Sequence, residues 1–237
     1  MKQTITPETD FAAGVILNVD KPLGWTSTDV VRRIKFALRR IGYRNLKVGH
    51  AGTLDPLATG VLLICTGKAT KQVETLQAER KEYIADLMLG ASTPSHDMEH
   101  AVDAYYPWEH IRKEDVEQAL RDLTGERLQT PPLYSAKKME GKRAYDYARE
   151  GETIEMRQAL IRIYEMELLS CELPRIRIRV ECSKGTYIRS LAQEIGEKLQ
   201  SGAYLTSLRR TRSGEYRAEE ALSPDEILEN LPLLKHI

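Results

Sequence analysis

The sequence is poor in cysteine and has no long hydrophobic run. Three cysteines (Cys65, Cys171 and Cys182) in 237 residues, an odd number with no C-x-x-C pair, favour no disulfide framework, and we expect them to be reduced and mostly structural. No window approaches about 18 uninterrupted apolar residues, and the first residues lack the apolar core of a signal peptide. These absences predict a cytoplasmic protein that contacts no membrane.

The chain also lacks a net charge, because 35 Lys and Arg residues balance 35 Asp and Glu residues. Charged residues make up 30% of the chain and hydrophobic residues 41%, which is typical of an ordinary globular protein. The length allows a sizeable core. We expect a flexible tail at residues 1–13 and one domain over residues 14–237, with no internal repeat.

The charges are distributed unevenly along the chain. Three basic clusters lie at residues 32–47, 137–143 and 208–217, whereas acidic residues concentrate around 97–126 and toward the C-terminus. The first cluster contains no acid and seven basic residues: Arg32, Arg33, Lys35, Arg39, Arg40, Arg44 and Lys47. Any one cluster is explained by a solvated helix face, but three together favour a phosphate-rich partner.

Hydrophobic periodicity predicts an α+β fold with a mixed sheet. "GVILNVDKPLGWTS" predicts a strand, a turn and a helix capped by Thr26 or Ser27 that ends at Gly42. "GVLLICTG" is typical of a strand buried on both faces, and "KEYIADLMLG" and "RIYEMELLS" predict further strands. Strands and helices alternate irregularly, which indicates α+β rather than α/β.

Two later segments have a more specific pattern. "RIRIRVECS" alternates strictly, so Ile176, Ile178 and Val180 face one side of a strand and three arginines face the other. A helix follows that ends at Gly202, with Arg189 in its first turn. Because an arginine there opposes the helix dipole, an anionic partner is expected nearby. Residues 127–151 are rich in Pro, Gly, Tyr and basic residues, which predicts an excursion from the core.

Two motifs match known sites only in part. "GVLLICTGKAT" has six residues between its glycines where a P-loop has four, and Ala69 replaces the magnesium-binding Ser or Thr. "HDMEH" has the H-x-x-E-H spacing of an inverted zinc protease, with His96 and His100 as ligands and Glu99 as base. That chemistry requires one helix face, and the flanking residues "STPS" and "AVDAYYP" favour no helix. We therefore predict no metal site.

Four stretches occur in an order that resembles the bacterial tRNA pseudouridine synthase B family, the TruB-type enzymes. They are "LNVDKPLGWTS", "VGHAGTLDPLATGVLLICTGKATK", "KEYIADLMLG" and "CSKGTYIRSLAQEIG", with "PPLYSAKKMEGKRAYDYAREG" before the last. The resemblance runs from about residue 14 to about residue 216. It implies the pseudouridine synthase fold, a mostly antiparallel sheet flanked by helices, with an RNA-gripping thumb at about residues 127–151.

The resemblance also implies the reaction, which converts the T-loop uridine at position 55 of tRNA to pseudouridine without a cofactor. On the family pattern Asp55 is the nucleophile, and its attack on the sugar C1′ or on the uracil ring stays open. Arg189 matches the arginine that pairs with this aspartate and keeps it ionised. Tyr83 matches the tyrosine that stacks on the target base, although spacing alone favours a core residue.

The family pattern further implies which residues contact the RNA. His50 matches the histidine that supports the T loop after the target nucleotide is flipped out. The remaining expected RNA contacts are Lys21, Tyr187 and Leu208 in the core and Lys137, Lys138, Lys142 and Arg143 in the thumb. The expected partner is the T arm of tRNA, bound by a monomer that requires no protein partner.

The chain departs from the family pattern at two places. Many relatives have T-D-T-x-D-x-x-G where this chain has "TPSHDMEH", which keeps Asp97 but changes the loop around it. No C-terminal extra RNA-binding domain is evident after "SGEYRAEEALSPDEILENLPLLKHI". Two alternatives to the enzyme stay open: a non-catalytic RNA-binding protein of the same fold, and a guide-RNA-dependent pseudouridine synthase.

Overall fold

A computed structural model describes residues 4–6, 8–134, 138–139, 142–143 and 156–231. The contacts divide the chain into two compact units. The first contains residues 1–83 and 209–237, and the second contains residues 84–208. Strands β4 (Lys81–Leu89) and β12 (Ala203–Ser213) have residues in both units. The division concerns contacts alone, so one catalytic domain over residues 14–237 stays a prediction.

The first unit is built on antiparallel strands. Strand β3 (Ala58–Thr66) pairs with β1 (Ile16–Lys21) and β2 (Val48–Ala51), and it lies between β1 and β12 in the strand order. Strand β13 (Tyr216–Arg217) pairs with β12. Nearly all residues of β3 are buried, which confirms the strand predicted from "GVLLICTG".

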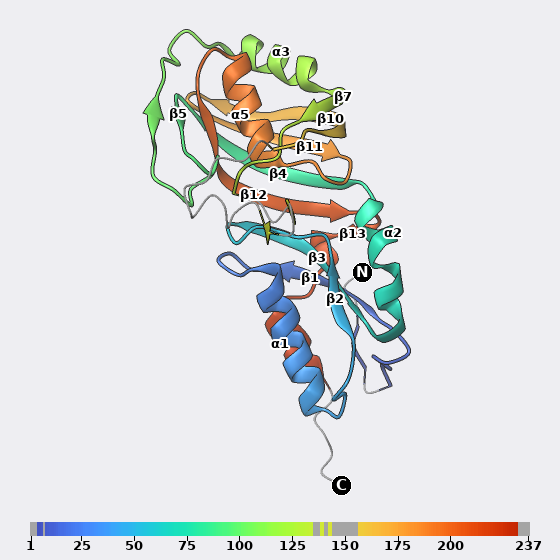
Figure 1. Cartoon of the computed structure of the whole chain (residues 1–237). Helices are drawn as coiled ribbons and strands as arrows, with labels where there is room; N and C mark the ends of the chain where they lie inside the picture. The colour runs from blue at the N-terminus through green and yellow to red at the C-terminus, as the bar shows by residue number, and fades with distance from the viewer. Residues whose placement is uncertain (1–3, 7, 135–137, 140–141, 144–155, 232–237) are drawn as a thin grey trace. The chain divides into compact units, whose positions relative to one another are not determined.

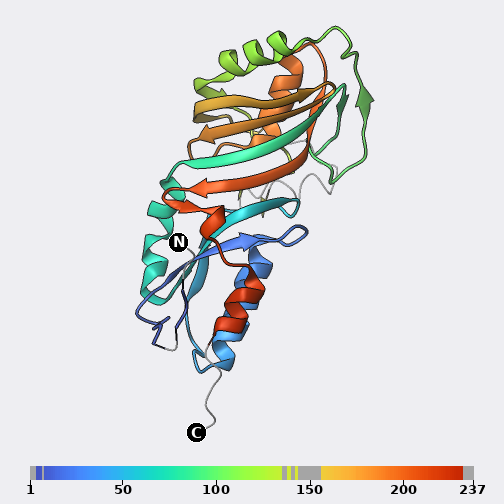
Figure 2. The same cartoon turned by 180° about the vertical axis from the view of Figure 1, so that it is seen from behind.

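Five helical segments are described in the first unit. Helix α1 (Ser27–Arg40) lies beside α6 (Pro224–Asn230), as Figures 1 and 2 show. The 3₁₀ segment η1 (Gly67–Gln72) leads into α2 (Val73–Ala78), and η2 (Ala218–Glu220) precedes α6.

Helix α1 begins and ends where the sequence predicts. Thr26 is its N-cap, and the Thr26 and Asp29 side chains form a reciprocal capping box. Val30, Ile34 and Leu38 are fully buried and form the inner face. Beyond the C-cap, Gly42 has a φ of +105° that favours glycine.

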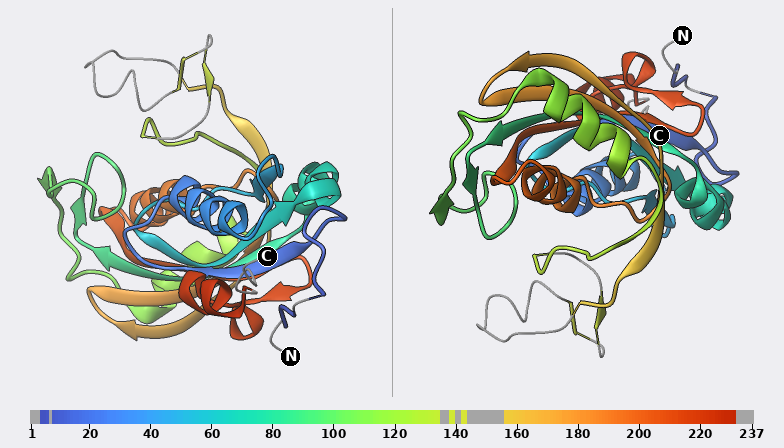
Figure 3. Two further views of the ribbon diagram at one scale, coloured as in Figure 1. Left: turned by 90° about the horizontal axis from the view of Figure 1, so that it is seen from below. Right: turned by 90° about the horizontal axis from the view of Figure 1, so that it is seen from above.

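The second unit continues the mainly antiparallel arrangement, in the strand order β12-β4-β11-β10-β7. Its strands include β7 (Gly125–Gln129), β10 (Ala159–Glu172) and β11 (Arg175–Cys182). Helices α3 (Lys113–Leu123) and α5 (Ile188–Lys198) lie side by side (Figure 3). Short pairs form between β5 (Ala91–Ser92) and β6 (Ala104–Tyr105), and between β8 (Lys138–Met139) and β9 (Lys142–Arg143). The fold class is therefore α+β.

The strand β11 follows its sequence pattern closely. Ile176, Ile178 and Val180 are almost completely buried, whereas Arg175 and Arg177 are exposed. Arg179 is half-buried because it forms ion pairs with Glu165 and Glu167 on β10. The predicted basic outer face is thus partly neutralised by acids on neighbouring strands.

No helix among the described residues is long and apolar enough to cross a membrane.

The structure defines three of the predicted boundaries more closely. Phe11 lies in the predicted flexible tail, yet its side chain is fully buried against Tyr43. Residues 127–129 lie in the predicted thumb but belong to β7, where they pair with residues 159–161 of β10. Helix α5 ends at Lys198 instead of Gly202, because Gln200 adopts a φ of +54° and the chain turns there.

Candidate active site

Asp55 lies in the loop between β2 and β3, and every backbone carbonyl from residue 52 to residue 56 accepts a hydrogen bond. Arg210 donates to the carbonyls of Gly52 and Thr53 at 3.1 and 3.4 Å. The Ser27 hydroxyl donates to the carbonyl of Leu54 at 3.0 Å. The Asp55 carbonyl accepts from the amide of Ala58 at 3.0 Å.

The carbonyl of Pro56 completes this set. It accepts from the amide of Gly24 at 2.9 Å and from the Lys21 amine at 3.3 Å. An irregular segment with all its acceptors satisfied has little freedom to rearrange. The loop therefore holds Asp55 on a rigid backbone.

Lys21, at the end of β1, is fully buried. Its amine also donates to the carbonyls of Trp25 at 2.6 Å and Pro22 at 2.9 Å. Burial lowers the pKa of Lys21 to about 8, while the Asp55 carboxylate raises it and Arg210 lowers it. These contacts indicate that Lys21 holds the Asp55 loop. Its contact with RNA stays a prediction.

His50 and Tyr83 belong to the same unit as Asp55. His50 lies on β2, and burial followed by the nearby Arg210 charge lowers its pKa, which a backbone hydrogen bond with Gly52 partly offsets. Tyr83 lies on the buried face of β4 and is 8% exposed.

Arg189 lies in the second unit, in the first turn of α5 as predicted. Its guanidinium is 4% exposed and lies 3.8 Å from the Asp97 carboxylate. It also donates to the carbonyls of Ser95 at 3.2 Å and Tyr134 at 2.8 Å. The expected anionic partner within this unit is therefore Asp97. Because Asp55 belongs to the other unit, its predicted pairing with Arg189 stays a prediction.

The N-terminus of α5 is fixed by a side chain from β7. The amide side chain of Gln129 accepts from the backbone N–H of Tyr187 at 2.8 Å and donates to its carbonyl at 3.2 Å. Ser190 donates to the carbonyl of Thr130 at 2.8 Å. Tyr187 and Leu208 are half-buried, which leaves part of each accessible to a ligand.

The structure groups the predicted residues by unit. Lys21, His50, Asp55 and Tyr83 lie in the first unit, and Arg189, Tyr187 and Leu208 lie in the second. Of the thumb residues, Lys138, Lys142 and Arg143 lie in the β8–β9 pair, and Lys137 lies outside the described residues.

Sequence reasoning missed the roles of Arg210, Ser27 and Asp97. Arg210 was one basic residue within the cluster at 208–217, and Ser27 was a candidate N-cap. Asp97 was named as the acid that the changed loop retains, without a partner. No spacing in the sequence points to these contacts, because each joins segments far apart in the chain.

The "HDMEH" segment does not adopt a helix. Residues 96–100 form turns and bends, and His96 has a φ of +60°. Asp97, within the motif, is instead the ion-pair partner of Arg189. Within the described ranges, no group of three or more His, Cys, Asp and Glu side chains could hold a metal ion. The geometry that an inverted zinc protease needs is absent from this segment.

Comparison with known proteins identifies the family. The profile "TruB family pseudouridylate synthase (N terminal domain)" matches residues 39–188, and "tRNA pseudouridylate synthase B C-terminal domain" matches residues 189–236. The chain is 57% identical over 221 residues to tRNA pseudouridine synthase B of Phocaeicola vulgatus, covering 93% of this chain and 94% of that protein. It is 46% identical over 220 residues to the protein of that name from Flavobacterium johnsoniae, covering 92% and 96%.

Solved structures give the same fold. The structure of a Cbf5-Nop10-Gar1 complex contains a chain that matches with a TM-score of 0.70 and 30% identity. The match covers 96% of this chain but 60% of that one. The two family profiles together span more than half of the sequence, and the relatives match over nearly their full length. The chain belongs to the TruB family of pseudouridylate synthases.

Proposed function

We propose that this tRNA pseudouridine synthase isomerises the T-loop uridine at position 55 of tRNA, with Asp55 as the nucleophile. The names of the curated relatives support the activity on tRNA. The rigid loop that carries Asp55 is the observation that supports its role. A turn aspartate needs no such support, whereas a nucleophile must be held where the reacting carbon will lie.

The reaction breaks the bond between uracil N1 and the sugar C1′ and joins C5 to C1′. The proton on C5 must leave, and N1 gains a proton, so that no net redox change occurs. Attack by the Asp55 carboxylate on C1′ would give a glycosyl ester that C5 displaces, whereas attack on the uracil ring would give an adduct that expels the carboxylate after the C5–C1′ bond has formed. Tyr83 would stack on the flipped base and lie near C5. His50 would occupy the space left in the T loop.

Arg189 would supply the positive charge that keeps the nucleophile ionised in a dry pocket. Its hydrogen bonds to the carbonyls of Ser95 and Tyr134 hold the guanidinium in orientation, with the Asp97 carboxylate 3.8 Å away. The partner RNA is the T arm, and the thumb residues Lys137, Lys138, Lys142 and Arg143 would contact its phosphates. We propose that the protein acts as a monomer, without a guide RNA or a protein partner.

One assay tests this function. The purified protein is added alone to an unmodified T-arm hairpin labelled with tritium at uridine C5, and both tritium release and pseudouridine in the digested RNA are measured. We expect both with the wild type and neither with Asp55→Asn, which should still bind the hairpin. Asp10→Asn is the matched control, because Asp10 is a turn aspartate whose carboxylate accepts from the amides of Ala12 and Ala13.

A guide-RNA-dependent synthase is the second candidate, since the chain resembles proteins solved in a Cbf5-Nop10-Gar1 complex and in an H/ACA RNP bound to a substrate RNA. It predicts no product from the protein alone. A non-catalytic RNA-binding protein predicts binding without tritium release under any condition. Near wild-type turnover by Asp55→Asn would contradict the proposed nucleophile.

A further inference from the structure

Arg210 is one of the largest fully buried side chains of the protein, at 2% exposure. Its guanidinium donates to three backbone carbonyls, those of Val61 at 2.7 Å, Gly52 at 3.1 Å and Thr53 at 3.4 Å. The planar guanidinium offers several donors in a fixed fork, which no other side chain can match. Arg210 thereby ties the start of the Asp55 loop to strand β3.

The position of Arg210 depends on a glycine of the neighbouring strand. Gly60 has a φ of +99°, and a Cβ atom there would collide with the backbone of Arg210. Lys21 pairs with Gly60 across β1 and β3, so Gly60 lies between two buried cations. Lys21 holds the far end of the same loop through Pro56. The loop is thus fastened by a cation on each side of Asp55.

The geometry points to Arg210 as a positioning residue for the reaction, which holds the backbone of residues 52 and 53 so that the Asp55 carboxylate stays aligned. This inference rests on the proposed role of Asp55. Arg210 acts through the loop, so its loss should lower the rate of the chemical step without weakening the binding of RNA. A misplacement of about 1 Å costs roughly 100-fold in rate.

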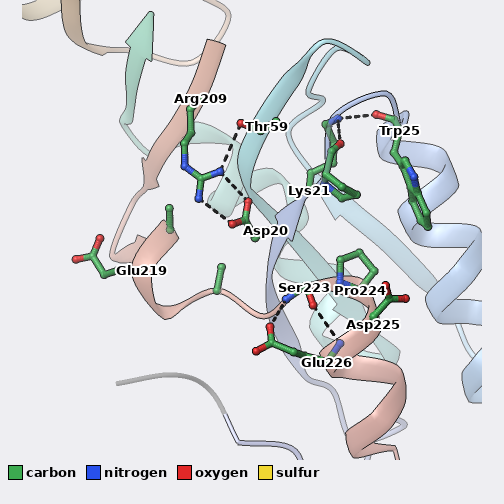
Figure 4. A pocket seen from close by; sticks show the side chains of 13 residues that line it. Asp20, Lys21, Trp25, Thr59, Arg209, Glu219, Ser223, Pro224, Asp225 and Glu226 are labelled. Atoms are coloured by element: carbon green, nitrogen blue, oxygen red, sulfur yellow. Dashed lines mark hydrogen bonds and ion pairs between the residues drawn. The ribbon is translucent and has the colours of Figure 1, made fainter. Parts of the chain in front are cut away.

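Arg209 supplies a matched control. Neighbouring residues of a strand point to opposite faces. Arg209 accordingly lies on the opposite face of β12 from Arg210, and it forms an ion pair with Asp20 at 2.7 Å, with Thr59 nearby (Figure 4). This pair lines a surface pocket of about 420 Å³, which Lys21 also lines. Both arginines therefore bear the same charge on the same strand, but only Arg210 contacts the Asp55 loop.

The test compares Arg210→Met, Arg210→Lys and Arg209→Met. Single-turnover rates on the T-arm hairpin, the Kd for the hairpin and thermal unfolding are measured for each. We expect Arg210→Met to lose about 100-fold in rate with an unchanged Kd. Arg210→Lys, which keeps the charge but has a single nitrogen in place of the guanidinium fork, should recover part of the rate. Arg209→Met should turn over like the wild type.

Equal rates for Arg210→Lys and the wild type would overturn the inference, as would a rate loss that only follows the unfolded fraction. If Arg210→Met does not fold, Arg210→Lys decides the question. A fully active Asp55→Asn variant would instead refute the proposed function, so the two failures are distinguishable.

A second observation concerns the outer face of α1. Phe36 is 65% exposed, and helical spacing places Arg32, Arg39 and Arg40 around it, all of them exposed. We call these four residues the α1 basic patch. Arg32 lies 3.8 Å from Asp29, but within the described ranges no acidic partner is found for Arg39 or Arg40.

We propose that the α1 basic patch binds RNA, with an unpaired base stacked on Phe36 and phosphates on the arginines. The inference rests on the proposed function, since tRNA is the expected partner. The buried residues of α1 lie on its inner face, and Phe36 is not one of them, so its ring does not belong to the hydrophobic core. An exposed ring among cations is complementary to a nucleotide, because a base stacks on the ring and its phosphate pairs with the charge.

The test measures Kd for unmodified full-length tRNA at several salt concentrations. Phe36→Ala should weaken binding by about 5- to 150-fold. Arg39→Glu/Arg40→Glu should make log Kd less dependent on log salt by about two. Arg175→Glu, an exposed arginine of the other unit, is the control. Patch variants that bind tRNA like the control would overturn the inference. A wild type that binds no tRNA would instead contradict the proposed function.

Discussion

The hydroxyl of Ser27 accepts the amide hydrogen of Leu54 at 2.9 Å and donates to the carbonyl of the same residue at 3.0 Å. One side chain at the first turn of α1 therefore satisfies both backbone groups of the residue before Asp55. Ser27 is 2% exposed, so water cannot replace it.

Ser27→Ala should reduce both stability and turnover. The substitution leaves two buried backbone groups of Leu54 unpaired, which lowers the free energy of unfolding by about 1–3 kcal/mol. It also removes a contact that holds the Asp55 loop, so the rate should fall. Thr26→Ala is the control, because it removes the N-cap of α1 at a cost of about 1 kcal/mol without touching Leu54. Urea unfolding and single-turnover rates measure the two effects. Equal rates per folded molecule for both variants would contradict the role of Ser27.

Asp97→Ala should destabilise the second unit, because it leaves the buried Arg189 without the carboxylate that lies 3.8 Å away. Removing one partner of a buried ion pair costs about 3 kcal/mol or more. Asp86→Ala breaks the solvent-exposed pair with Arg177 and should cost little. Chemical denaturation compares the two. A loss for Asp97→Ala no larger than that for Asp86→Ala would show that the buried pair contributes nothing.

Lys21 should make stability depend on pH in the alkaline range. Its pKa is about 8 in the folded protein, mainly through burial, against an ordinary value of 10.5. Between these two values the unfolded chain binds more protons, so stability rises with pH. Asp55 and Asp29 oppose this shift, and Arg210 reinforces it.

Urea unfolding of the wild type and of Lys21→Met at several pH values from 7 to about 10 tests this expectation. The difference in unfolding free energy between the two should shift in favour of the wild type as the pH rises through this window. A difference that does not change with pH would refute it.

Removing the charge of Arg210 should raise the pKa of His50. Arg210 is the charged group that lowers this pKa, after burial. An NMR titration of the His50 ring in Arg210→Met should therefore move its midpoint upward. Arg209→Met should leave the midpoint in place. A midpoint that does not move in either variant would mean that the Arg210 charge is screened from the ring.

The elements were predictable where the pattern is local. The buried strand β3, the alternation of β11 and the caps of α1 follow from neighbours within a few residues. The start of the thumb could not be predicted in this way, because β7 joins the sheet through β10, which lies some thirty residues later in the chain. A short strand whose partner is distant in sequence has no local signal.

The same limit applies to the site. Asp55 and Arg189 were predicted as site residues from the family pattern, which carries information beyond spacing. Arg210 contacts Gly52 across 158 residues, and Ser27 contacts Leu54 across 27. Since a side chain that binds a distant backbone carbonyl requires no particular residue there, the sequence around residue 52 contains no trace of it.

The saturated loop around Asp55 has a consequence for hydrogen exchange. The amides of Gly24, Leu54 and Ala58 donate to Pro56, Ser27 and Asp55 respectively. Gly24 lies before α1, Leu54 lies in the irregular segment 52–57 and Ala58 begins β3, yet all three amides are hydrogen-bonded like those of a strand. They should exchange with deuterium as slowly as the neighbouring β3, so that the loop opens only when the sheet itself unfolds.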